Sequence, residues 1–111
     1  MKQSKEQKTL EEGIRLFNAG KHYESHEEFE SIWLTASGDK KLFLQILILL
    51  AAVEVHKTHA RFETARRVLV KIKKKIDDLS EMNLYHLRKE HLTNCYIESH
   101  QGQTPVIPHQ D

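Results

Sequence analysis

The stretch FNAGKHYESHEEFESIW, which runs from Phe17 to Trp33, predicts the fold class of this chain. Apolar residues recur at helical spacing at Leu10, Ile14 and Phe17, the last of which is the first residue of the stretch. Gly20 follows just past the last of them, at a place where helices commonly end in the left-handed conformation. A second helical pattern begins immediately afterwards. The stretch therefore predicts two helices joined by a short turn.

The second helix carries polar residues among its apolar ones. At about 100° per residue, His26 and Glu30 fall between Phe29 and Trp33, on the side expected to face inward. Burying a charged group without a partner is costly, and a His and a Glu one turn apart can reach each other. We therefore expect His26 and Glu30 to be largely buried and to be hydrogen-bonded to each other or to a third helix.

The rest of the chain continues the helical pattern. Its segment ILILLAAV, residues 46–53, is apolar on every side, which is typical of a helix enclosed by other helices. The patterns predict helices over about 5–18, 22–36, 40–59 and 62–79, and a fifth over about 84–98, with no strand and no long repeat. Short loops between consecutive helices favour an all-α fold, a small up-and-down bundle of four to five helices.

The length of 111 residues fits one domain, which we expect to span residues 1–99. Residues 100–111 contain Pro105 and Pro108, so we expect a flexible C-terminal tail there. A single cysteine, Cys95, fits a reducing compartment, and the polar N-terminus lacks the apolar segment of a signal peptide. The apolar runs are too short for a membrane span. We therefore expect a cytoplasmic protein that does not enter a membrane.

The charge pattern argues against a nucleic-acid partner. The formal net charge is only +1, so the whole chain has no strong attraction for nucleic acid or anionic lipid. A basic stretch on the expected fourth helix contains Arg66, Arg67, Lys71 and Lys73 to Lys75. No stacking aromatic residues accompany this stretch, and two aspartates follow it directly. A solvated helix surface therefore explains it better than a nucleic-acid interface.

One block of residues resembles a known family, the domain of unknown function 309 family. The resemblance rests on Phe17-Asn18, Gly20, Glu24, His26-Glu27, Glu30 and Trp33, and further along on Phe43, Gln45, His56 and Ala65. It covers about residues 12–79 and implies a small all-helical domain. The family is sometimes labelled a predicted metal-dependent hydrolase, although its activity is unestablished. Where the family usually has a Gly-Asn turn before the fourth helix, this chain has Ala60 and Arg61.

One hypothesis is a site for a divalent metal. A His and a carboxylate at i and i+4 can bind one ion from a single helix face, so His26 and Glu30 are candidate ligands. His56, and in one arrangement also Gln45, would complete the site from the third helix, because catalytic zinc commonly takes three protein ligands. Glu27 would then act as the general base. This hypothesis describes a metal-dependent hydrolase.

The alternative hypothesis is a non-catalytic module that binds a protein or a ligand. In it, Glu30 accepts a hydrogen bond from His26, while Gln45, His56 and the Trp33 indole complete a buried polar network. The helix–Gly–helix opening also resembles a single tetratricopeptide unit, which would suit protein binding. A metal-free ligand pocket and a structural homo-oligomer are further alternatives, and no specific partner is predicted. We expect Trp33 to fill the space over Ala52, because interiors pack densely.

Overall fold

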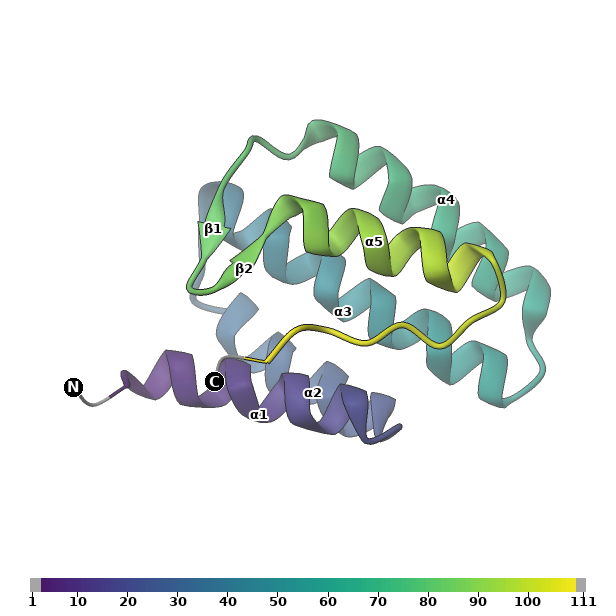
Figure 1. Ribbon diagram of the computed structural model, residues 1–111, viewed down its shortest axis with the longest axis horizontal. Helices are drawn as coiled ribbons and strands as arrows, with labels where there is room; N and C mark the ends of the chain where they lie inside the picture. The colour runs from purple at the N-terminus through teal and green to yellow at the C-terminus, as the bar shows by residue number, and fades with distance from the viewer. Residues whose placement is uncertain (1–2, 110–111) are drawn as a thin grey trace.

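The computed structural model describes residues 3–109, which form an all-helical bundle with one short pair of strands (Figure 1). Its elements are α1 (Lys5–Asn18), α2 (His22–Trp33), α3 (Gly38–Thr58), α4 (Phe62–Asp78), β1 (Asn83–Leu84), β2 (Leu87–Arg88) and α5 (Lys89–His100). This confirms the predicted fold class and the approximate positions of the first four helices. The expectation of no strand was wrong, because residues 83–88 form an antiparallel hairpin and α5 begins only after it.

Helix α3 lies at the centre of the bundle, as its apolar sequence predicted. It packs against α2, α4 and α5, while α1 packs on α2. Leu44, Leu47 and Leu50 on α3 are completely buried. Among residues 3–109, every helix is too short or too polar to cross a lipid bilayer.

The turns that join α1 to α2 and α3 to α4 have the same geometry. In the first, Gly20 has φ +83° and the Lys21 amide donates to the Leu16 carbonyl at 2.9 Å. In the second, 40 residues later, Ala60 has φ +58° and the Arg61 amide donates at 2.8 Å to the carbonyl of residue 56. Both are the left-handed helix ends that glycine favours. The chain therefore uses the same kind of helix end at both turns, once with glycine and once with alanine.

The buried carboxylate of Glu54, which is 4% exposed, joins α3 to the end of α5. The Lys57 ammonium lies 3.1 Å from Glu54 Oε2, and the Ser99 hydroxyl donates to the same oxygen at 2.9 Å. Lys57 Nζ also donates to the Ser99 carbonyl at 2.9 Å. The charge of Glu54 is therefore paired and hydrogen-bonded, as a buried charge must be.

The chain after α5 packs against the bundle in the residues described, where the sequence predicted a flexible tail. Gly102, at φ +84°, turns the chain back, and residues 103–109 then run past α5 towards α1 (Figure 1). Ile107 is only 1% exposed. The part of that prediction concerning residues 110–111 lies outside the described residues. Side chains of the bundle bond the main chain of this segment, and composition alone does not reveal such contacts.

The two related turns predict opposite effects of exchanging glycine and alanine. We expect Ala60→Gly to raise the free energy of unfolding by about 0.5–1 kcal/mol. A left-handed non-glycine residue costs about 1–2 kcal/mol, which exceeds the backbone entropy that glycine loses, about 0.5–1 kcal/mol. Chemical denaturation measures this difference.

Gly20→Ala is the matched control and should lower the free energy of unfolding by a similar amount. Among the described residues, nothing lies within 4 Å of a Cβ built at Gly20, so the effect would be conformational rather than steric. Destabilisation by both exchanges would contradict the shared geometry of the turns.

Candidate functional site

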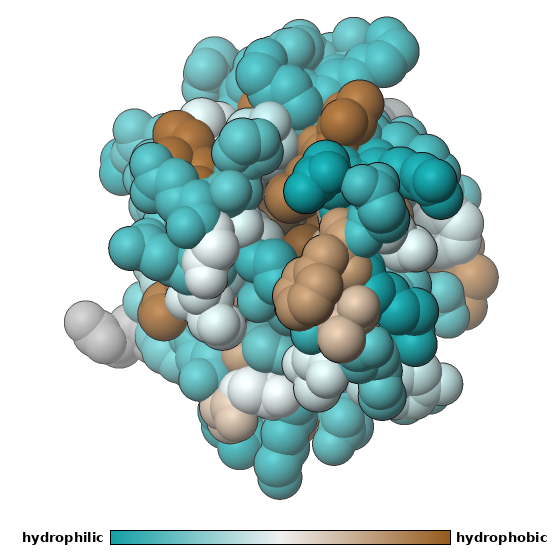
Figure 2. Space-filling view, turned by 90° about the vertical axis from the view of Figure 1, so that its right-hand side faces the viewer, coloured by the Kyte–Doolittle hydropathy of each residue, from teal (hydrophilic) through white to brown (hydrophobic). Residues whose placement is uncertain are grey.

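A groove lies between α2 and the C-terminal half of α3. It consists of two depressions, with volumes of about 300 Å³ and about 160 Å³, that share Tyr23 and Val55 in their walls. Four histidines also line it: His22, His26, His56 and His59. We call this surface the histidine groove. The turn from α3 to α4 lies at the right-hand end of Figure 1, and the view of that end in Figure 2 shows a mostly hydrophilic surface with separate hydrophobic residues.

Helical spacing brings the histidines together. His22 and His26 are one turn apart on α2, and His56 and His59 are three residues apart at the end of α3. The Tyr23 ring stacks on the His26 ring with centroids 6.4 Å apart and an interplanar angle of 17°. Tyr23 itself is 63% exposed. An exposed aromatic side chain therefore forms part of the wall of both depressions.

The smaller depression contains an imidazole whose protonation state is constrained. The Arg61 guanidinium donates from Nε to His56 Nδ1 at 3.1 Å. The neutral His56 ring therefore carries its proton on Nε2, which makes that nitrogen a hydrogen-bond donor. Partial burial lowers the pKa of His56, and the nearby positive charges of Arg61 and His59 lower it further. At neutral pH the ring is mainly uncharged.

The larger depression is bordered by a buried imidazole. His22 is 8% exposed, and its ring meets the Phe17 ring edge-on with centroids 4.8 Å apart. Burial lowers the pKa of His22 and outweighs the attraction of the nearby Glu54 charge. His22 Nε2 and His26 Nδ1 are buried without a hydrogen-bond partner among residues 3–109. Such atoms are uncommon in proteins, and two of the five found among the described residues border the groove.

The prediction that His26 and Glu30 are both largely buried and hydrogen-bonded to each other was wrong. Glu30 is exposed, His26 is only partly buried, and within the described residues the two side chains form no hydrogen bond. The buried stripe of α2 is instead His22, Ser25, Phe29 and Ile32. Helix α2 is thus rotated relative to the orientation expected from its sequence.

Helix α1 sets this rotation. A Cβ added at Gly13 would lie 2.6 Å from Phe29 Cε1, so only glycine allows the two helices to approach so closely. The Ser25 hydroxyl donates to the Gly13 carbonyl at 2.8 Å. These contacts place Phe29 and Ser25 at the centre of the α1–α2 interface and turn Glu30 towards solvent.

The other predicted site residues are separated. Glu27 is exposed, and Gln45 is partly buried. Trp33 is also partly buried, with the Lys41 ammonium 4.4 Å from its ring centroid. Among the predicted site residues, only His26 and His56 line the smaller depression. Trp33 does not line the space over Ala52, so the expectation that it fills this space was wrong.

The predicted metal ligands do not fit a three-ligand centre in this arrangement. Within residues 3–109, no group of three or more His, Cys, Asp or Glu side chains is placed to hold one ion. His26 and His56 share a depression, but Glu30 and Glu27 are absent from its lining. The arrangement therefore offers two imidazoles rather than a complete set of ligands.

The predicted site did not include three residues that line the groove, Tyr23, His22 and His59. A signal was nevertheless present, because His22–His26 and His56–His59 are each spaced to share one face of a helix. Two such pairs, each beside one of the inter-helix turns, would have pointed to this end of the bundle. What the sequence lacked was the evidence that α2 and α3 lie side by side there.

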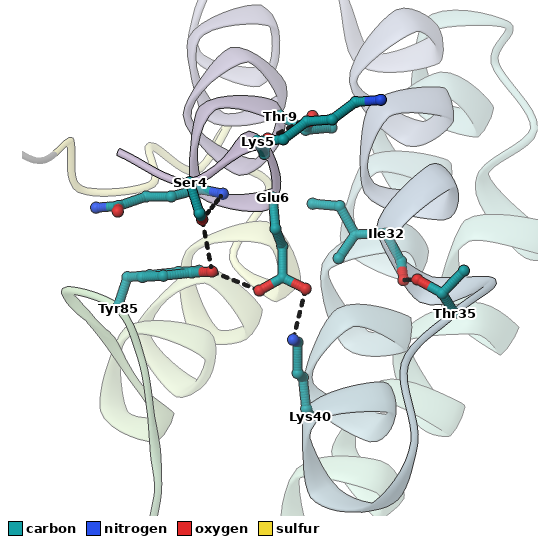
Figure 3. A network of polar contacts seen from close by, with 9 residues as sticks. Ser4, Lys5, Glu6, Thr9, Ile32, Thr35, Lys40 and Tyr85 are labelled. Carbon is teal, nitrogen blue, oxygen red and sulfur yellow. Dashed lines mark hydrogen bonds and ion pairs between the residues drawn. The ribbon is translucent and has the colours of Figure 1, made fainter. Parts of the chain in front are cut away.

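A further depression, of about 440 Å³, lies between the start of α1 and the end of α2. Beside it, Ser4, Glu6, Lys40 and Tyr85 are linked by polar contacts (Figure 3). Glu6 accepts hydrogen bonds from Lys40 and from the Tyr85 hydroxyl, and these bonds lower the pKa of Glu6, the bond from Lys40 most strongly. Burial, more than the contact with Glu6, raises the pKa of Tyr85. This network ties the β-hairpin to α1 and α3.

The chain matches a known protein family. The model of the family described as "Domain of unknown function (DUF309)" matches residues 10–68, which is more than half of the chain. The matched region includes α2, α3 and every residue that lines the histidine groove. No curated protein and no solved structure was found to match the chain.

Filling the smaller depression tests whether it is open. We expect Ala52→Leu to leave the free energy of unfolding unchanged or to raise it by up to about 1 kcal/mol, because the added atoms would occupy the open space beside Ala52. Ala51 provides a matched control, since it is completely buried on the same helix. Ala51→Leu should overpack the core and cost about 1–3 kcal/mol. Similar destabilisation by both changes, measured by denaturation, would mean that the depression is closed in solution.

The buried imidazole of His22 predicts a pH dependence of stability. In the unfolded chain the pKa of a histidine is about 6.5. Burial lowers the pKa of His22 in the folded state. The contribution of the neutral His22 ring to the free energy of unfolding is therefore complete above the unfolded-state pKa. It is lost as the pH falls from there through the lowered folded-state pKa. We expect the wild type to lose more stability than His22→Phe between pH 7.5 and 5.5 in denaturation experiments. Equal losses in the two proteins would assign the pH dependence to other groups.

Proposed function

This chain belongs to the DUF309 family, whose description states no activity, and we propose that it is a non-catalytic binding module. The histidine groove would receive a ligand that carries a branched aliphatic group beside a carboxylate. Such a group occurs both in small carboxylic acids and at the C-terminus of a peptide. The single observation that carries the proposal is the pairing, in the smaller depression, of an apolar floor with the His56 imidazole.

The apolar part of the ligand would lie over the smaller depression. Ala52 and Val55 line it from α3, and the Tyr23 ring lines it from α2. A volume of about 160 Å³ suits a short aliphatic group rather than a large substrate. Because the Tyr23 ring is largely exposed, covering it would remove apolar area from water, and exposed tyrosines commonly contribute strongly to binding.

The carboxylate would accept a hydrogen bond from His56 Nε2. Because His56 Nδ1 accepts the bond from Arg61, the ring proton is fixed on Nε2. The Arg61 charge adds a favourable potential for an anion. No acidic side chain lines the smaller depression, whereas Glu24 lines the larger one. The charges near the two depressions therefore favour an anionic group in the smaller one.

Metal-dependent hydrolysis remains a second prediction with less support. It would require Glu30, or another ligand, to join His26 and His56 around one ion, and Glu27 to reach a bound water. Both carboxylates are exposed on α2 and lie outside the lining of the groove. A binding role requires no such rearrangement, which is why we place it first.

Titration with isovalerate tests the proposed function. This ion carries an isopropyl group beside a carboxylate. We expect saturable changes in the NMR signals of the His26 and His56 rings and of the Ala52 methyl group. The dissociation constant should be about 1 mM, since so small a ligand gains only about −4 kcal/mol. Ala52→Leu, which fills the depression, should remove the effect.

Isopentylamine is the matched control ligand, because it keeps the apolar group and replaces the carboxylate with a cation. Equal responses to both ligands would contradict the carboxylate contact, and no response to isovalerate would contradict the proposal. A parallel titration with Zn²⁺ distinguishes the second candidate. Stoichiometric binding that shifts both imidazoles and loses affinity in Glu30→Gln would favour a metal centre instead.

A further inference from the structure

The C-terminal tail is held through its main chain by a side chain of α1. Asn18 donates from Nδ2 to the Ile107 carbonyl at 2.8 Å and accepts at Oδ1 from the Ile107 amide at 2.9 Å. Both main-chain groups of one residue are therefore bonded by a single amide side chain. This pairing imitates the bonds of a neighbouring β-strand, and it requires the bound segment to be extended.

Three other side chains bond the main chain of the same segment. The Cys95 thiol of α5 points to the Val106 carbonyl at 3.7 Å, and His86 Nε2, in the hairpin turn, donates to the Pro108 carbonyl at 2.7 Å. Lys57 Nζ of α3 reaches the Gln103 carbonyl at 3.5 Å. We call these four side chains, Asn18, Lys57, His86 and Cys95, the tail site. They come from separate parts of the bundle and converge on one segment of the tail.

The side chains of the tail alternate between buried and exposed positions. Pro105 is buried, Val106 is 61% exposed, and Ile107 is only 1% exposed. An extended segment produces this alternation. The tail site thus makes two kinds of contact. Hydrogen bonds hold the main chain of any extended segment, whereas the buried positions select proline and an aliphatic residue two positions later.

These features are those of a peptide-binding site. Peptide-recognition domains commonly bind an extended segment through its main chain and take specificity from alternate side chains. We propose that the tail site recognises an extended peptide of the pattern Pro-x-aliphatic in a partner protein, and that the segment from Pro105 to Pro108 occupies it as an internal competitor. This site is separate from the histidine groove and does not depend on the function proposed for that groove.

The connection to α5 determines how strongly the tail competes. The Gln103 amide donates to the Glu98 carbonyl at 2.9 Å, and Gly102 adopts φ +84° to return the chain along the bundle. Because this link is short, the tail is present at its own site at a high effective concentration. A partner peptide therefore binds only weakly until the tail is displaced, so tail release regulates access to the site.

The test uses the full chain and a fluorescein-labelled peptide with the sequence of residues 103–109, QTPVIPH. In the chain, Ile107→Asp places a charge at the buried position and should expel the tail. We expect the peptide to bind this variant at least about tenfold more tightly than the wild type, as measured by fluorescence anisotropy. Adding Asn18→Ala to Ile107→Asp should abolish this binding, and so should replacing the isoleucine of the peptide with aspartate.

A second variant keeps the proposal testable if Ile107→Asp does not fold. Gly102→Ala leaves every contact of the tail site in place, and among the described residues nothing lies within 4 Å of the added Cβ. It strains only the returning turn, so it should raise peptide affinity by about fivefold. Equal peptide binding by the wild type and a folded variant, or no binding by either, would overturn the proposal. Binding that survives Asn18→Ala would also overturn it.

Discussion

The buried charge of Glu54, near the end of α3, is the constraint on which much of this structure depends. A buried carboxylate must be paired, and removing one partner of such a pair is costly. Lys57 pairs with it and also bonds the carbonyl of Ser99, so the same ammonium group fixes where α5 ends against α3. The returning tail begins directly after that point, and its Gln103 carbonyl meets the same Lys57. One internal charge therefore determines the position of α5 and the start of the tail.

A second constraint acts between α1 and α2. The close contact of Phe29 with Gly13, and the bond from Ser25 to the same glycine, fix the rotation of α2 about its axis. That rotation turns Glu30 into solvent and leaves His26 at the edge of the core, where it faces α3 across the histidine groove. A larger residue at position 13 would push the helices apart, and the groove would lose its shape. The candidate site is thus determined by packing on the opposite side of α2.

The end of α3 serves two different surfaces through adjacent residues. His56 lines the histidine groove beside α2, while Lys57 bonds α5 and the tail. The end of α1 is similar, since Asn18 holds the tail and Lys21, just after the turn, borders the groove. Residues near the ends of α1 and α3 therefore contribute to both surfaces.

The sequence by itself determined the helices and the family. Helical periodicity and Gly20 predicted the first four helices closely, because these signals arise between residues near in the chain. Two of the candidate metal ligands that it named, His26 and His56, line the same depression of the groove. Only the tertiary structure decided the rotation of α2, the pairing of Glu54, the open space over Ala52 and the position of the tail. Each of these depends on contacts between residues far apart in the chain, such as Asn18 with Ile107, and no local pattern encodes such contacts.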